Sequence, residues 1–464
     1  MTATMTTGSR TAGDRYVPSS GNGGYSVTHY AIDLRYRAAT NRLDASATIT
    51  AISDQELGRF TLDLTRLQAS RVMVNGRKAG KTQSNGKLAV VPSVPIASGE
   101  TFTVIIDYSG TPAPRRSPWG LVGWEELEDG VIVASQPTGS PTWFPCNDHP
   151  SDKASYSIRV TTEQAYSVLC NGVLTAHTVA SGRGTWQYEQ AEPTSTYLAT
   201  VQIGRYSMEE VALNGVPGML AYPRRLQSRV HADFADLPAM LACFEAAFGP
   251  YPFASYTAVI TEDELEIPLE AQSMAIFGAN HIDGNGSEER LVAHELAHQW
   301  FGNSVGVRSW QHIWLNEGFA CYAEWLWSES NGGPSADSLA RSYYSVLRSL
   351  PQDIVLGDPG PADMFDDRIY KRGALTLHAL RSVLGDDVFF TLLRDWVALH
   401  RHGVVDTADF RAHAARYSTV PLDALFDDWV FSAVLPAFVG ASPAPGSSSG
   451  APGASSGSAR RGRR

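Results

Sequence analysis

The chain has 464 residues, of which 43% are hydrophobic, 10% aromatic and 18% charged, and its formal net charge at pH 7 is −11. This length and composition are typical of a globular protein with two or three domains, each large enough to bury a core. The negative charge argues against a general nucleic-acid binder, because it would repel phosphates. No run of eighteen apolar residues occurs, so the sequence predicts no membrane-spanning helix.

The N-terminal residues and the cysteines indicate the compartment. Residues 1–24 are rich in Thr, Ser and Gly and lack the apolar stretch of a secretory signal, so we expect a disordered N-terminus. Cys146, Cys170, Cys243 and Cys321 lie far apart, without a Cys-x-x-Cys pair, which favours free buried thiols over disulfides. These features together predict a cytoplasmic protein.

Residues 25–206 show the alternation of apolar and polar side chains that is typical of strands. The clearest runs are Tyr30, Ile32, Leu34 and Tyr36; Phe60, Leu62 and Leu64; Phe102, Val104 and Ile106; and Tyr156, Ile158 and Val160. Three dipeptides that tolerate positive φ predict hairpin turns, namely Asn75-Gly76, Asn85-Gly86 and Asn171-Gly172. We therefore expect a largely antiparallel N-terminal β-domain over residues 25–206.

After residue 206 the period of the apolar residues changes, and helical spacing dominates residues 207–440. A helix is predicted over residues 232–248, ended by Gly249-Pro250, and a short strand over 256–261. Further helices are predicted over residues 287–301, 316–330, 335–347, 370–384, 386–399, 407–417 and 422–433. A β-domain followed by a mainly helical domain is an α+β fold. Residues 441–464 form a Ser/Pro/Gly/Arg-rich stretch and are predicted to be a disordered tail.

The strongest chemical signal is the motif His294-Glu-Leu-Ala-His298. Residues four apart in a helix lie about 40° apart around its axis and one turn along it, so both imidazoles can reach one ion. Glu295 lies beside them, where it can work on the metal-bound water without ligating the metal. This motif alone also fits a solvated helix face that carries two histidines.

A second motif, Leu315-Asn-Glu317-Gly-Phe-Ala320, favours the metal site. Eighteen residues separate His298 from Glu317, enough to end one helix and begin a second, antiparallel helix that returns a carboxylate to the histidine pair. Two histidines, one glutamate and an open fourth position are typical of a catalytic Zn²⁺ site with one ion, although the spacing leaves manganese and cobalt open. Glu324, two turns after Glu317, can accept a hydrogen bond from a ligating histidine or lie exposed.

These two motifs together resemble the gluzincin zinc metallopeptidases of the aminopeptidase N and leukotriene hydrolase family. Further stretches agree with that family: Gly249-Pro-Tyr-Pro-Phe253; Thr142-Trp-Phe-Pro-Cys146 with Asp148 and Pro150; Tyr370-Lys-Arg-Gly373; and Asp427-Asp-Trp429 with Leu435-Pro436. The resemblance implies a saddle-like β-domain followed by a thermolysin-like zinc catalytic domain. It matches a short form that lacks the C-terminal helical domain of larger relatives.

The resemblance also implies roles for three more residues. Tyr370 matches the family's oxyanion-stabilising tyrosine, and Glu270 matches the glutamate that binds the substrate's free amine. Gln136 matches a second amine-binding position in the β-domain. The stretch Ile267-Pro-Leu-Glu-Ala271 keeps the glutamate but not the glycine or asparagine of the family's Gly-x-Met-Glu-Asn, which puts the shape of the first side-chain pocket in doubt.

We therefore predict a zinc aminopeptidase that removes the N-terminal residue from peptide substrates. In this hypothesis His294, His298 and Glu317 hold the zinc, and Glu295 assists attack by the zinc-bound water. An endopeptidase or an epoxide-opening hydrolase on the same site stays open, because the stretch around Glu270 is altered and Gln136 is neutral. So does a catalytically inactive peptide-binding scaffold. The sequence indicates no nucleic-acid or membrane partner, and it leaves the oligomeric state and the preferred substrate undetermined.

Overall fold

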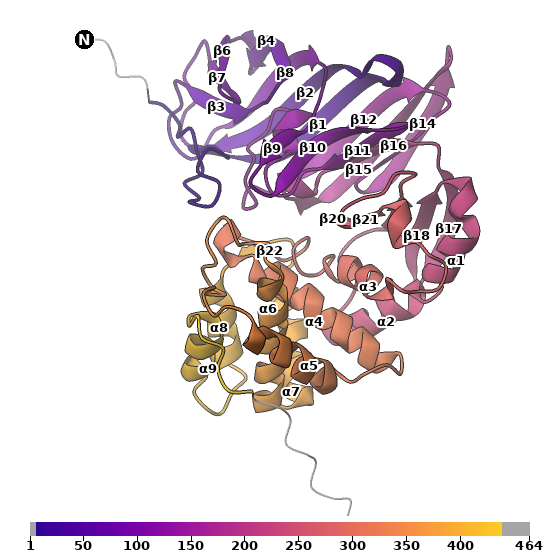
Figure 1. Cartoon of the computed structure of the whole chain (residues 1–464). Coiled ribbons are helices and arrows are strands. Elements are labelled where there is room, and N and C mark those ends of the chain that lie inside the picture. The colour runs from indigo at the N-terminus through magenta and orange to yellow at the C-terminus, as the bar shows by residue number, and fades with distance from the viewer. Residues whose placement is uncertain (1–5, 439–464) are drawn as a thin grey trace, which may run out of the picture.

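The structure, a computed structural model, describes residues 6–438 and consists of a β-rich half and a helix-rich half (Figure 1). The β-rich half lies at the top of Figure 1, and the helices lie below it. Strands make up most of the first part of the chain and helices predominate in the second part, which confirms the predicted α+β fold. The two halves face one another across the region that carries the candidate site.

The largest sheet of the β-rich half has eight strands. In spatial order they are β14 (Val173–Ala180), β15 (Arg183–Thr194), β12 (Ala154–Glu163), β1 (Tyr25–Arg37), β2 (Arg42–Ser53), β8 (Thr101–Gly110), β4 (Gln68–Val74) and β5 (Arg77–Lys78). The pairs are antiparallel except for β1 and β12, which are parallel. Tyr30, Ile32 and Leu34 are buried, because the alternation in β1 turns them all to one face of the sheet.

Two smaller sheets complete this half. One has the order β13 (Ser167–Cys170), β16 (Val201–Gly204), β11 (Gly130–Ala134), β10 (Gly120–Leu127) and β9 (Arg115–Ser117), and the other has the order β3 (Phe60–Asp63), β7 (Lys87–Val91) and β6 (Gly80–Ser84). Asn75-Gly76 and Asn85-Gly86 form the predicted hairpin turns, with positive φ at all four residues. The prediction for Asn171-Gly172 is wrong, because β13 pairs with β16 and β14 pairs with β15. Buried Asn171 instead donates from its side chain to two carbonyls, Leu198 O and Gln272 O.

The helix-rich half begins with a five-stranded sheet. Its order is β17 (Ser207–Leu213), β18 (Val216–Tyr222), β19 (Tyr256–Ile260), β21 (Met274–Phe277) and β20 (Leu269–Ala271). The short strands β22 (Gly306–Val307) and β23 (Val404–Val405) pair in parallel. The helices are α1 (Gln227–Asp233), α2 (Leu237–Phe248), α3 (Glu289–Ala297), α4 (Trp314–Ser330), α5 (Ala336–Ser349), α6 (Asp367–Leu384), α7 (Asp386–His400), α8 (Thr407–Ala415) and α9 (Asp423–Val430).

Two of the predicted helices have different bounds in the structure. The helix predicted over residues 232–248 is divided between α1 and α2, because Pro238 cannot donate a backbone hydrogen bond and stands in the first turn of α2. The helix predicted over residues 287–301 is shorter, since α3 ends at Ala297. Its last ligand candidate, His298, lies just beyond that end.

The predicted disorder of residues 1–24 is wrong for residues 6–24. Gly8 N donates to Arg59 O in the β-rich half. Asp14 accepts a hydrogen bond from Trp310 N, and buried Tyr16 donates to Asp358 Oδ1, both in the helix-rich half. These long-range partners hold a polar segment that has no local periodicity, which explains why a sequence pattern does not reveal it. The predicted disordered tail, residues 441–464, lies outside the described residues.

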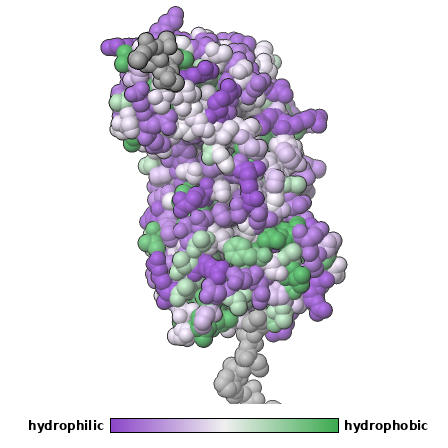
Figure 2. Space-filling view, turned by 90° about the vertical axis from the view of Figure 1, so that its left-hand side faces the viewer, coloured by the Kyte–Doolittle hydropathy of each residue, from purple (hydrophilic) through white to green (hydrophobic). Residues whose placement is uncertain are grey.

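The surface of the two halves differs in polarity. Figure 2 shows a largely polar β-rich half, with apolar side chains gathered on the lower, helical half of that face. Within residues 6–438 no helix combines the length and the hydropathy that crossing a bilayer would require. All four cysteines are free thiols, as predicted, and Cys146, Cys170 and Cys321 are buried whereas Cys243 is half-buried.

Candidate metal centre

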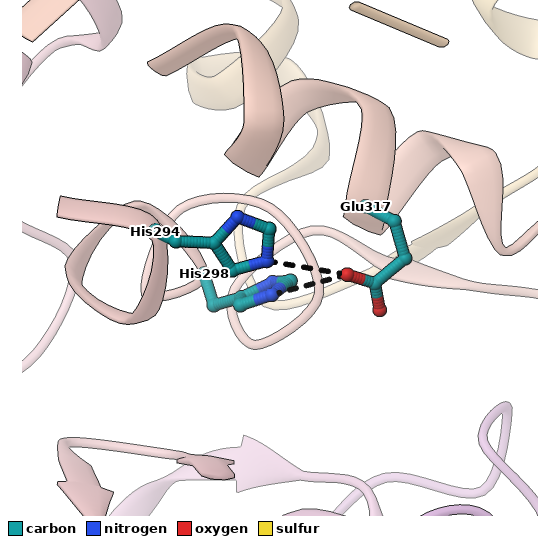
Figure 3. A group of neighbouring side chains, drawn as sticks. All are labelled: His294, His298 and Glu317. Carbon is teal, nitrogen blue, oxygen red and sulfur yellow. Dashed lines mark ion pairs between the residues drawn. The ribbon is translucent and has the colours of Figure 1, made fainter. Parts of the chain in front are cut away.

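Helices α3 and α4 bring the two halves of the predicted metal motif together. His294 lies in the last turn of α3, His298 follows the end of that helix, and Glu317 lies in the first turn of α4. Figure 3 shows both rings and the carboxylate pointing toward one another. His294 Nε2 lies 3.5 Å and His298 Nε2 3.3 Å from Glu317 Oε2.

The geometry of this group fits a tetrahedral zinc ion. Metal–ligand bonds of about 2.1 Å at tetrahedral angles place neighbouring ligand atoms about 3.4 Å apart, and the two nitrogen–oxygen distances are 3.5 and 3.3 Å. One ligand atom from each of the three residues lies within 4.8 Å of the others. Two imidazole nitrogens and one carboxylate oxygen are also the donor set that zinc takes in catalytic sites.

The outer nitrogens of both histidines have acceptors. His294 Nδ1 lies 2.7 Å from Glu324 Oε1, and His298 Nδ1 lies 3.0 Å from the backbone oxygen of Phe301. Such contacts fix the ring orientation and direct the other nitrogen of each ring toward the metal. Glu324 therefore makes the acceptor contact that its position two turns after Glu317 suggested, and it is buried rather than exposed.

Electrostatic coupling within the group is strong. Burial alone would lower the pKa of both histidines, but Glu317 and Glu324 raise the pKa of His294 to about 9, and Glu317 and Glu270 raise that of His298 to about 10. Burial alone would raise the pKa of Glu317, but the two histidines lower it to about 2. The glutamates thus attract positive charge to this point, and a divalent cation takes the place of protons when it binds.

Glu295 is aimed into the same space. Its side chain is 4% exposed, and its Oε2 atom is buried without a hydrogen-bond partner among residues 6–438. Burial raises its pKa, a shift that His294 and His298 oppose. A buried carboxylate oxygen with no protein partner beside a metal group suits a base that takes a proton from water.

Tyr370 is positioned by the crossing of α4 and α6. Gly318 follows Glu317, and a Cβ atom at Gly318 would lie 2.8 Å from the Cα of Gly373, so only glycines let these helices approach so closely. The Tyr370 ring stacks on His294, with 6.0 Å between centroids. Burial raises the pKa of Tyr370 well above its ordinary range, reinforced by Glu317, so its hydroxyl stays protonated and can donate.

Glu270 and Gln136 meet across the two halves. Gln136 Nε2, from the segment after β11, donates to Glu270 Oε1 in β20 at 2.5 Å. One ligand atom from each of Glu270, Glu295 and His298 lies within 4.8 Å of the other two. Burial raises the pKa of Glu270 to about 7 although His298 opposes the shift. All seven predicted site residues therefore lie around one point, although the sequence separates Gln136 from Tyr370 by more than 200 residues.

Comparison with known proteins matches both halves to one family. Residues 26–198 match the Peptidase M1 N-terminal domain, and residues 235–429 match the Peptidase family M1 domain. An M1 zinc metallopeptidase from Deinococcus radiodurans superposes with a TM-score of 0.85 at 30% identity, covering 93% of this chain and 99% of that chain. The chain belongs to the peptidase M1 family of zinc metallopeptidases.

Curated relatives of this M1 chain are longer. Endoplasmic reticulum aminopeptidase 1 of Homo sapiens is 26% identical over 412 residues, which are 81% of this chain and 44% of that protein. Leucyl aminopeptidase of Saccharolobus solfataricus is 25% identical over 395 residues, which are 78% of this chain and 48% of that protein. The chain thus spans less than half the length of these relatives, whereas it covers nearly all of the M1 structure from Deinococcus radiodurans.

The M1 site includes two cations that the sequence analysis missed. Arg290 Nη1 lies 3.7 Å and Lys371 Nζ lies 4.0 Å from Oε2 of Glu324. They help to lower the pKa of Glu324, a carboxyl whose pKa burial alone would raise. Lys371 lies in the Tyr370-Lys-Arg-Gly373 motif, so its position in a family motif could have pointed to it. Arg290 lies in a predicted helix outside any such motif, and no sequence feature distinguishes it.

Proposed function

We propose that this M1 chain is a zinc aminopeptidase that hydrolyses the first peptide bond of peptides with a free N-terminus. The observation that carries the proposal is the position of Glu270, which has a carboxylate oxygen within 4.8 Å of ligand atoms of Glu295 and His298. A carboxylate so close to the metal group can bind a substrate amine about one residue from the scissile carbonyl. Only the first peptide bond is then aligned for attack.

Glu295 moves the protons of the reaction. Zinc bound by His294, His298 and Glu317 would supply Lewis acidity, lowering the pKa of a water molecule and polarising the scissile carbonyl. The Glu295 carboxylate accepts the proton of the attacking water and then delivers it to the departing amine. Its buried Oε2, which has no partner among the described residues, is free for that water.

Tyr370 stabilises the negative charge that develops on the carbonyl oxygen. Its hydroxyl remains protonated because burial, with the nearby glutamates, raises its pKa. A preformed donor of this kind contributes mainly in the transition state. Its stacking on His294 and the close crossing of α4 and α6 hold it beside the metal group.

Glu270 and Gln136 bind the substrate's α-amino group. The amide of Gln136 orients Glu270 through their 2.5 Å hydrogen bond, and the Gln136 side-chain oxygen has an acceptor site for the amine. Because Gln136 is neutral, a single carboxylate carries the charge that holds the ammonium group. Loss of a second ionised acceptor weakens such binding by about 1–2 kcal/mol.

The relatives support this substrate class. A substituted form of the M1 zinc metallopeptidase from Deinococcus radiodurans has been solved bound to a Tyr-Ser-Ala substrate, at 29% identity and a TM-score of 0.85, covering 92% of this chain and 99% of that chain. The curated relatives are aminopeptidases by name.

An aminoacyl-arylamide series tests the function. We expect turnover of free-amine substrates that a zinc chelator abolishes and added zinc restores, and no turnover of the N-acetylated counterparts. Equal rates on free and acetylated peptides would favour an endopeptidase, and an epoxide substrate hydrolysed in place of peptides would favour the epoxide-opening alternative. Zinc binding without turnover of any of these substrates would favour the inactive scaffold.

A further inference from the structure

Lys153 joins the two halves of the molecule beside the metal centre. It directly precedes β12 in the β-rich half, three residues after Pro150 of the segment that resembles the family's Phe-Pro-x-x-Asp-x-Pro. Its Nζ donates to three backbone oxygens of the other half, Asn303 O at 2.8 Å, Ser304 O at 2.8 Å and Gly403 O at 3.1 Å. Burial lowers the pKa of Lys153 to about 7, and these three carbonyl oxygens are the partners that stabilise its ammonium form.

The turn that Lys153 contacts is the continuation of the helix that carries the histidines. Beyond α3 the backbone continues in wider, five-residue turns, with Asn303 N donating to His298 O at 3.0 Å and Ser304 N donating to Gln299 O at 3.1 Å. Backbone oxygens at the end of a helix carry partial negative charge and attract a cation. Lys153 therefore caps, from the other half, the turn whose first carbonyl belongs to His298.

The same turn also holds the strand that carries Glu270. Asn303 Nδ2 donates to Ala271 O at 3.0 Å, and Gln299 Nε2 donates to the same oxygen at 3.1 Å. Gln299 Oε1 in addition accepts from Ser273 N at 2.8 Å. A displacement of the turn at Asn303 would thus move both His298 and Glu270.

We propose that Lys153 is a positioning residue that fixes the amine-binding pair, Glu270 and Gln136, relative to the metal group. Gln136 lies in the β-rich half and its partner Glu270 in the other, so their contact needs the two halves in a fixed relation. Lys153 connects the two halves by binding the turn at Asn303 and Ser304, and the positions of both Glu270 and His298 depend on that turn. The statement about the amine rests on the proposed aminopeptidase function, whereas the statement about the metal does not.

Substitution of Lys153 with a matched control tests this role. Lys153→Met removes the three donors but keeps the length of the stem, and Tyr16→Phe removes another contact between the N-terminal segment and the helix-rich half, Tyr16 Oη to Asp358 Oδ1 at 2.6 Å. We expect Lys153→Met to release zinc to a chelator about tenfold faster, as for residues that orient metal ligands. We also expect a higher KM for an aminoacyl-arylamide, whereas Tyr16→Phe changes neither quantity even if it lowers Tm.

Lys153→Arg provides the test if Lys153→Met does not fold. It keeps the positive charge, but its planar guanidinium directs its donors differently from an ammonium group, so we expect a several-fold rise in KM with Tm nearly unchanged. Zinc release and KM equal to those of the wild type in folded Lys153 variants would overturn the positioning role. So would equal changes in Lys153→Met and Tyr16→Phe. If the wild-type protein binds zinc but cleaves no arylamide, the proposed aminopeptidase function is refuted. The positioning role of Lys153 is then still tested by the rate at which the variants release zinc.

Discussion

Replacing Gly318 by alanine tests whether the crossing of α4 and α6 sets the geometry of the centre. The new Cβ would lie 2.8 Å from Gly373 Cα and 3.0 Å from its carbonyl carbon, against an ordinary carbon–carbon contact of about 3.5–4 Å. Both contacts are with backbone, which cannot rotate away as a flexible side chain can. The helices must therefore separate by nearly an ångström.

The effect on stability and the effect on activity should differ in size. Overpacking costs about 1–3 kcal/mol, but alanine regains about 1 kcal/mol of helix propensity over glycine, so the net loss of unfolding free energy is about 0–2 kcal/mol. Glu317 adjoins the substituted residue, and Tyr370 lies one turn before Gly373. A misplacement of about 1 Å in such groups can lower kcat about 100-fold.

Two measurements on Gly318→Ala separate these effects. Denaturant unfolding gives the free energy, and arylamide hydrolysis at saturating substrate gives kcat for protein of measured zinc content. Gly80→Ala is the control, because a Cβ there meets nothing closer than 3.4 Å in a strand of the other half. Zinc-loaded Gly318→Ala with wild-type kcat would refute the idea that this crossing positions Tyr370 against the metal ligands.

Four further substitutions have defined outcomes. Glu295→Gln should retain zinc by metal analysis but lose turnover by about 10²–10⁴-fold, and retained turnover would reject the base assignment. Tyr370→Phe should lower kcat by about 10²–10³-fold with little change in KM, whereas an unchanged kcat would remove the hydroxyl from the mechanism. Glu324→Gln should weaken zinc binding by about 10–100-fold in a chelator competition, and an unaltered affinity would contradict the role of the His294 contact. Burial raises the pKa of Asp152 from 3.8 to about 7, so the folded state binds this proton at a higher pH than the unfolded chain, and the cost of the buried charge disappears as pH falls from 7 to 4. The unfolding free energy of the wild type relative to Asp152→Asn should therefore rise by about 3 kcal/mol over that range, and a pH-independent difference would exclude a buried charge at this residue.

Local patterns were sufficient for much of the fold because their causes are local. Period two predicts the strands of the β-rich half and helical spacing predicts the helices of the other half, and α4, α6 and α7 begin within three residues of their predicted starts. The change of period placed near residue 206 does not mark the end of the strands, because β17 and β18 occupy residues 207–222 and join a five-stranded sheet. The Asn75-Gly76 and Asn85-Gly86 turns follow from backbone freedom at those residues alone. Asn171-Gly172 failed because its neighbouring strands find partners in different sheets, which a dipeptide cannot encode.

For the candidate site, the sequence by itself determined which side chains can do the chemistry. The spacing of His294 and His298 is a property of one helix, and the residue types around them are those that zinc and proton transfer require. Only the tertiary structure decided how these groups meet: the distance from Glu317 to the two rings, the contact of Gln136 with Glu270, and the reach of Lys153 to the turn after His298. Those relations depend on packing between segments that lie far apart in the chain. The importance of the glycines at the crossing of α4 and α6, and of the carbonyls that Lys153 contacts, becomes visible only when the partner segments are in place.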